Sequence, residues 1–111
     1  MIARISLFLL ALAAPAAAED WSAMTGDEIK GALSGVTLKY ARASQSFSKD
    51  GSTEYVAGRA SYGQWEVRGD QYCSVWPPSD HWTCYDMMQK PGHLRFIGAS
   101  GAITDGTINT P

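Results

Sequence analysis

Residues 63–85 read GQWEVRGDQYCSVWPPSDHWTCY and contain three of the four tryptophans and both cysteines of the chain. Gly69 and Asp70 are typical of a two-residue hairpin turn. Such a turn places Glu66 opposite Cys73 in two paired antiparallel strands. The first half of this stretch therefore predicts a tight β-hairpin.

The two cysteines predict how the chain continues. A disulfide between Cys73 and Cys84 defines a second hairpin, because directly opposed residues of antiparallel strands are close enough to be bridged. In that register Trp76 faces His81, and residues 77–80 form the loop. The two hairpins share one strand, so the stretch predicts a three-stranded antiparallel unit.

This register separates the side chains into two faces. The core face comprises Trp65, Val67, Tyr72, Trp76, Tyr85 and Met87. The outer face, expected to be largely in solvent, comprises Gln64, Glu66, Arg68, Cys73, Val75, Trp82, Cys84 and Asp86. The disulfide is thus expected on the outer face as a structural link between strands. A redox-active pair is the alternative, although that chemistry typically uses a Cys-x-x-Cys spacing, which this pair does not have.

The N-terminus has the features of a secretory signal peptide. Arg4 precedes an apolar run over residues 5–12, and small residues follow as far as Ala18. Cleavage after Ala18 makes residues 1–18 the signal peptide and leaves 111 − 18 = 93 residues, 19–111, as a single small β-rich domain. The apolar run is shorter than the roughly 20 residues that span a bilayer. We therefore expect no membrane association after cleavage, with a retained anchor as the alternative.

The compartment follows from the leader and the cysteines together. Disulfides persist in oxidising compartments, and the short alanine-rich leader is typical of bacteria. We expect the protein to be periplasmic or secreted. Residues 19–111 carry eight basic and eleven acidic side chains, so their net charge is 8 − 11 = −3, and the basic residues are scattered singly. This distribution argues against a nucleic-acid partner.

Residues 21–33 predict a short helix before the sheet. Thr25 and Glu28 have the spacing of a capping box, and Met24 and Ile29 are at the positions of a hydrophobic staple. The expected apolar stripe comprises Trp21, Ile29, Ala32 and Leu33. The two glycines of the segment weaken the helix, so it depends on packing against the sheet.

From residue 36 onward the apolar residues alternate with polar ones, as in β-strands. The strand-like segments are residues 36–40, 45–48, 53–57, 62–67, 71–76, 82–88, 94–98 and 102–108. Short strands at such even spacing predict an antiparallel meander. The fold class is therefore mainly β (α+β): a short N-terminal helix packed on an antiparallel β-meander or small β-barrel, closed or partly open, with one hairpin disulfide.

Two connections have specific expectations. A loop of residues 49–51 with Gly51 in the left-handed conformation puts Phe47 and Tyr55 on one face, whereas a two-residue Asp50-Gly51 turn separates them. We expect the first arrangement. Residues 58–63 are interpreted as a loose connection or a bulged start of the next strand.

The order of these features resembles a family of small exported proteins, mostly from alphaproteobacteria, whose function is unknown. The shared segments are the helix MTGDEIKGALSG, the turn FSKDGS, the GxWxVxxDxxC segment GQWEVRGDQYC and a second cysteine after a tryptophan-rich hairpin. The resemblance covers residues 21–98. It implies the fold and export, and it implies neither an activity nor catalytic residues.

No catalytic or metal-binding pattern stands out. His81 and His93 have no ligand spacing that predicts a metal site, and the serines are in neither a nucleophile-elbow nor a Ser-x-x-Lys setting. Glu66 and Asp86 are expected on the outer face, where a carboxyl group is not buried enough to act as a general acid. We therefore expect no enzyme activity, no metal and no cofactor.

Aromatic side chains are the most informative functional signal. Two interpretations are open: all of them fill the core, or some of them form a groove for a ligand. The expected binding residues are Trp76, His81, Trp82 and Tyr85. The sequence favours a non-enzymatic binding or interaction module whose partner is a small apolar ligand or a periplasmic protein. The alternatives are a lysozyme or protease inhibitor that presents residues 76–82 to its target, and a small enzyme with an unrecognised site.

Overall fold

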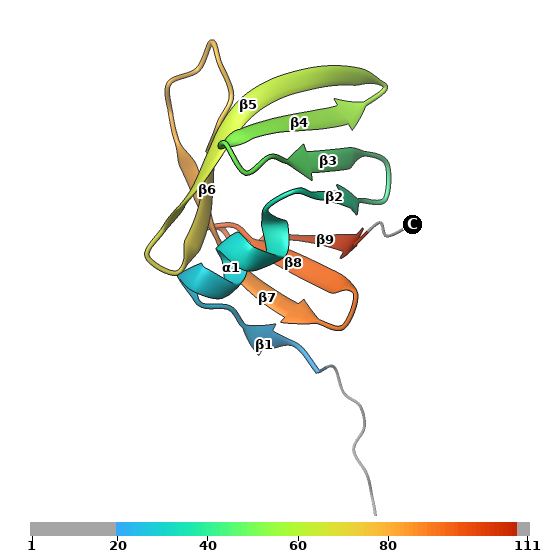
Figure 1. Cartoon of the computed structure of the whole chain (residues 1–111), viewed down its shortest axis with the longest axis vertical. Coiled ribbons are helices and arrows are strands. Elements are labelled where there is room, and N and C mark those ends of the chain that lie inside the picture. Colours follow the sequence, from blue (N-terminus) through green and yellow to red (C-terminus); the bar gives the residue numbers. More distant parts are fainter. Residues whose placement is uncertain (1–19, 109–111) are drawn as a thin grey trace, which may run out of the picture.

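The computed structural model describes residues 20–108, which form one helix and a nine-stranded antiparallel sheet (Figure 1). The elements are β1 (Ser22–Ala23), α1 (Gly26–Leu33), β2 (Val36–Lys39), β3 (Ser44–Phe47), β4 (Ser52–Ala57), β5 (Arg59–Arg68), β6 (Gln71–Val75), β7 (Thr83–Lys90), β8 (His93–Ile97) and β9 (Ile103–Ile108). Strands β2 to β9 close into an eight-stranded barrel, because β2 pairs with β9 and β7 pairs with β8. The predicted fold class is confirmed, and of the two alternatives the barrel is closed.

The ninth strand, β1, covers an edge that the barrel leaves open. Strand β6 pairs with β7 only as far as Asp86. Beyond that point β1 pairs with Met88 and Gln89 of β7, while β8 pairs with the other side of β7. The predicted signal peptide, residues 1–18, lies outside the described residues.

The helix begins where its capping residues predict. Thr25 is the N-cap: its hydroxyl accepts a hydrogen bond from the Glu28 N–H at 3.2 Å, and the Glu28 carboxylate accepts one from the Thr25 N–H at 2.9 Å. Met24, Ile29 and Leu33 are buried in the core. The expectation that Trp21 belongs to the apolar stripe of the helix is wrong. Its ring precedes the helix and lies against Lys90 and Arg95, with their charged groups 4.7 and 4.0 Å from the ring centre.

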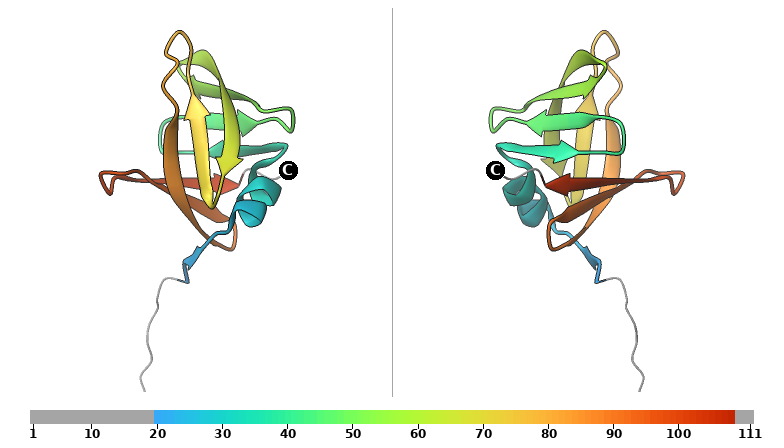
Figure 2. Two further views of the ribbon diagram at one scale, coloured as in Figure 1. Left: turned by 90° about the vertical axis from the view of Figure 1, so that its left-hand side faces the viewer. Right: turned by 90° about the vertical axis from the view of Figure 1, so that its right-hand side faces the viewer.

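Gly26 allows the helix to dock on the β5–β6 turn. Its N–H donates a hydrogen bond of 2.7 Å to the carboxylate of Asp70. A side-chain carbon at Gly26 would lie 2.1 Å from the carbonyl oxygen of Gly69. The close approach therefore needs a glycine here, despite its cost to helix propensity. Figure 2 shows that α1 lies at one end of the barrel and the β6–β7 connection at the other.

The three-stranded unit has the predicted register near the disulfide. Glu66 is opposite Cys73, and Cys73 is opposite Cys84. The pairing of β6 with β7 ends at Ser74 and Thr83, so the expected pair of Trp76 with His81 is wrong. The connecting loop consequently spans residues 76–82 and is longer than predicted.

The two other predicted connections have different outcomes. Phe47 is opposite Thr53, which leaves the loop of residues 49–51 and puts Phe47 and Tyr55 on one face, with Gly51 at a φ of 96°. This expectation is confirmed. Residues 58–63 are not a loose connection, because β5 begins at Arg59 and pairs with β4 directly after Gly58. The resulting hairpin is a long ribbon that ends in exposed residues.

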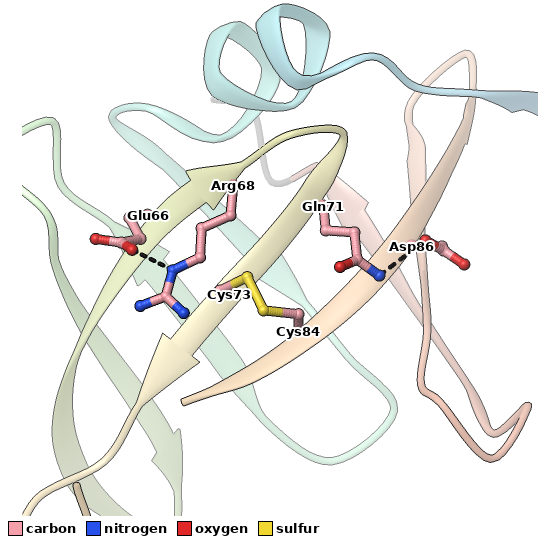
Figure 3. Close-up of a disulfide and its surroundings, with 6 residues drawn as sticks. All are labelled: Glu66, Arg68, Gln71, Cys73, Cys84 and Asp86. Atoms are coloured by element: carbon pink, nitrogen blue, oxygen red, sulfur yellow. Dashed lines mark hydrogen bonds and ion pairs between the residues drawn. A yellow bond between two sulfur atoms is a disulfide. The ribbon is translucent and has the colours of Figure 1, made fainter. Parts of the chain in front are cut away.

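The disulfide lies on the outer face, between the Glu66–Arg68 pair on one side and Gln71 and Asp86 on the other (Figure 3). Cys73 and Val75 are nonetheless buried, so the expectation of a largely solvent-exposed face is wrong for these two residues. The Arg68 guanidinium lies 4.6 Å from the ring centre of Trp82. Since Arg68 is on β5 and Trp82 directly precedes β7, this contact crosses β6 and shields the disulfide.

The barrel interior is filled mainly by aromatic rings. Phe47 lies at the centre, with ring centroids 5.8 Å from both Trp65 and Tyr72 and 6.4 Å from Phe96. Trp65 is also held by a hydrogen bond of 2.9 Å from its indole N–H to the Ser48 carbonyl oxygen. Of the predicted core face, Trp65, Tyr72 and Met87 are buried, and Val67 and Tyr85 pack against them partly buried. Trp76 is half-buried and does not belong to this core, so the expectation is wrong for that residue.

Candidate functional site

A cavity of about 230 Å³ opens at the end of the barrel remote from the helix. Strand β6 shows this placement: Gln71 follows the turn on which the helix docks, and Trp76 follows the opposite end of the strand. The cavity is lined by Tyr40, Gln45, Tyr55, Tyr72, Ser74, Trp76, Tyr85, Phe96 and Thr104. None of these side chains is charged at neutral pH.

Five rings follow one another around the cavity. They are, in order, Trp76, Tyr55, Tyr40, Phe96 and Tyr85. The centroids of successive rings are 6.1 to 6.3 Å apart, which is within the range of direct aromatic contact. We call these five residues the aromatic arc.

Two glycines, one in β5 and one in β9, make room for the arc. A side-chain carbon at Gly63 of β5 would lie 2.7 Å from the Trp76 ring, and one at Gly106 of β9 would lie 2.9 Å from the Tyr40 ring. Each ring therefore lies directly against the backbone of a strand. Glycine inside a strand is often explained by such a close approach.

A buried amide forms the polar floor of the cavity. The Gln45 side-chain oxygen accepts a hydrogen bond of 2.7 Å from the Tyr40 hydroxyl. Its side-chain nitrogen donates to the Thr53 hydroxyl at 2.9 Å and to the Tyr72 hydroxyl at 3.2 Å. Both amide hydrogens are therefore used within the protein, which removes the cost of burying the amide.

Burial raises the pKa of Tyr40 far above its ordinary value, and the neighbouring Tyr72, Tyr55 and Tyr85 raise it further. Burial also raises the pKa of Tyr72, while its hydrogen bonds with Ser74 and Gln45 lower it. The floor of the cavity therefore stays uncharged over the physiological pH range.

These shifts predict a loss of stability in alkaline solution. The unfolded chain releases the two phenolic protons near pH 10.0, whereas the folded protein retains them. The folded state then binds more protons than the unfolded state. The two tyrosines therefore make their full contribution to the free energy of unfolding below this pH, and that contribution is lost as the pH rises above it. Urea unfolding at a series of pH values should show this fall, and Tyr40→Phe should make it less steep. Tyr62→Phe, at an exposed tyrosine, is the matched control; equal slopes in both variants would contradict the assignment.

The structure brings only two of the four predicted binding residues to the cavity. Trp76 and Tyr85 line it. His81 is exposed in the β6–β7 loop, and Trp82 lies on the outer face against Arg68. A binding role for these last two would thus concern a different surface.

Several residues that line the cavity were not predicted from the sequence to take part in binding, notably Tyr40, Gln45, Tyr55 and Phe96. Two features of the sequence pointed to some of them. One is the three-residue loop 49–51, which puts Tyr55 on the core face, and the other is the pair of glycines inside β5 and β9, Gly63 and Gly106. What could not be anticipated was that strands distant in sequence would bring these residues together.

Other candidate sites are weaker. A depression of about 510 Å³ lies between the start of α1 and the β3–β4 loop. Its charged side chains have both signs and are all exposed: Asp27, Lys30, Lys49, Asp50 and Glu66. Within residues 20–108 no group of three or more His, Cys, Asp or Glu side chains could hold a metal ion.

Comparisons of the chain with protein-family models, with curated proteins and with solved structures each found no match. In the part of the chain that the structure describes, no helix has the length and apolar character needed to cross a membrane.

Proposed function

We propose that this protein is an exported binding protein that holds a small molecule in the cavity at the open end of its barrel. One observation carries the proposal: the aromatic arc surrounds a preformed cavity with an uncharged polar floor. Binding sites are typically concave and mostly apolar, with a few fixed polar groups.

The size of the cavity limits the ligand. Sites for drug-sized molecules have volumes of roughly 300–1,000 Å³. At about 230 Å³ this cavity fits a smaller molecule. Its lining contains hydroxyl groups, such as that of Ser74, but no charged or basic side chain that could activate one as a nucleophile. The arrangement therefore favours binding over catalysis.

Export of the protein to the periplasm is part of the proposal. The leader-like residues 1–18 support it, and the Cys73–Cys84 disulfide is compatible with it. The ligand would accordingly be a molecule that reaches the periplasm.

Filling the cavity tests the proposal. Thr104 lines the cavity from β9, whereas Thr107 lies three residues further on the opposite face of the same strand. The protein should be purified from the periplasm and analysed by native mass spectrometry. We expect a bound small molecule with the wild type and with Thr107→Phe, and its loss with Thr104→Phe. A ligand that Thr104→Phe retains would move the site elsewhere, and no ligand in any variant would contradict the proposal.

A further inference from the structure

We propose that the ligand is a small organic cation of the quaternary ammonium type, held against the ring faces of the aromatic arc. This inference rests on the proposed function, since it names the chemical class of the ligand in the same cavity. Aromatic rings attract cations because the face of each ring carries partial negative charge.

The orientation of the rings supports a cage. Three of the four successive pairs in the arc are nearly perpendicular, with interplanar angles of 76°, 74° and 85°. The remaining pair, Tyr55 and Tyr40, is inclined by only 33° and forms a continuous wall. Walls that meet at near right angles surround a ligand on several sides, which is the arrangement that a cation bound by ring faces requires.

The hydrogen bonds of the floor fit a cation without N–H groups. Both amide hydrogens of Gln45 and the hydroxyl hydrogen of Tyr40 are directed to partners within the protein. The floor therefore offers no spare amide donor to a carboxylate or phosphate. A quaternary ammonium group has no hydrogen to donate, so it loses no hydrogen bond when it leaves water for this cavity. A primary ammonium would need acceptors for three N–H groups.

The charge of the surroundings favours the same class. The lining contains no Lys, Arg or His side chain that would repel a cation or bind an anion. Residues 19–111 have a net charge of 8 − 11 = −3, which favours the approach of cations over anions. Among the common classes of small polar ligand, anions are thus the least suited to this cavity.

The glycines keep the cage open in the absence of a ligand. Trp76 lies against the backbone at Gly63, and Tyr40 lies against the backbone at Gly106. Two of the walls are thus supported by main chain rather than by flexible side chains. A preformed cage reduces the ordering cost of binding.

Choline and its neutral carbon isostere, in which a tert-butyl group replaces the trimethylammonium group, form the decisive pair of probes. They differ in charge and hardly in shape. Calorimetric titration of the purified full-length exported protein should show choline binding at least about tenfold more tightly than the isostere, because a desolvated cation gains this much from ring faces.

The arc itself is tested with Trp76, a half-buried ring at the rim. Trp76→Leu should weaken choline binding about tenfold, whereas Trp76→Phe, which keeps a ring, should weaken it less. Tyr55→Leu and Tyr55→Phe form a second matched pair in case the first leucine variant unfolds, and a thermal melt of each variant identifies that case. Equal effects of leucine and phenylalanine at both positions would contradict the role of the rings.

The outcomes separate this inference from the proposed function. Equal binding of choline and the isostere would contradict the proposal that the ligand is a cation, and the proposal of a small-molecule site would stand. Binding of neither probe would also overturn it; the proposed function would still stand if a co-purified ligand is lost from Thr104→Phe. Failure of both measurements would overturn both proposals.

Discussion

Replacing Phe47 with alanine is expected to lower the free energy of unfolding by about 3–5 kcal/mol, the usual cost of removing a buried phenylalanine ring. Its side chain is 1% exposed and contacts the rings of Trp65, Tyr72 and Phe96. The barrel closes around this position, so neighbouring strands cannot collapse into the space left behind. Urea unfolding followed by circular dichroism measures the effect.

The loss is large for a domain of this size, whose total stability is expected to lie at about 5–15 kcal/mol. Tyr62→Ala provides the control, because that ring is 68% exposed on the β4–β5 ribbon. It should change the stability by no more than about 0.5 kcal/mol. Similar effects of the two substitutions would show that Phe47 is not at the centre of the core.

Replacing both cysteines with alanine is expected to cost about 3 kcal/mol, the chain-entropy value for a loop of roughly a dozen residues. Cys73 and Cys84 are 11 residues apart and enclose the long β6–β7 loop. Only the pair Ser74–Thr83 lies between the disulfide and that loop. Without the bond, this end of the two strands is held by few backbone hydrogen bonds.

Reduction of the wild-type protein should have the same effect as the double substitution, and the urea midpoint under oxidising and reducing conditions measures it. The double variant should be insensitive to reductant. Equal midpoints for the wild type under both conditions would contradict a structural role for the disulfide.

The local pairing of strands could be predicted from the sequence where a short turn or the disulfide fixes the register of a hairpin. The Gly69-Asp70 turn places Glu66 opposite Cys73, and the loop that ends at Gly51 places Phe47 and Tyr55 on one face. Such arguments need only residues that are close in the chain. They can therefore predict the register of individual hairpins.

The remainder depends on contacts between distant segments. The seam between β2 and β9 joins residues 38–39 to residues 107–108, and no local pattern encodes it. The cavity shares this origin, since Tyr40 and Thr104 reach it from opposite sides of the seam. Trp82 lies on the outer face, as its register predicted, against the Arg68 side chain two strands away. It is not among the residues that line the cavity, although it was expected to take part in binding.

The seam between β2 and β9 is only two residue pairs long, Leu38 with Ile108 and Lys39 with Thr107. A molecule in the cavity would contact residues on both sides of this seam, such as Tyr40 and Thr104, and would hold the two strands together without a covalent bond. Because such a molecule binds only the closed barrel, its occupancy and the folding equilibrium are thermodynamically linked. At a free concentration a hundred times its Kd, the ligand would raise the free energy of unfolding by about 2.7 kcal/mol. This is comparable to the contribution expected from the disulfide on the outer face of the barrel.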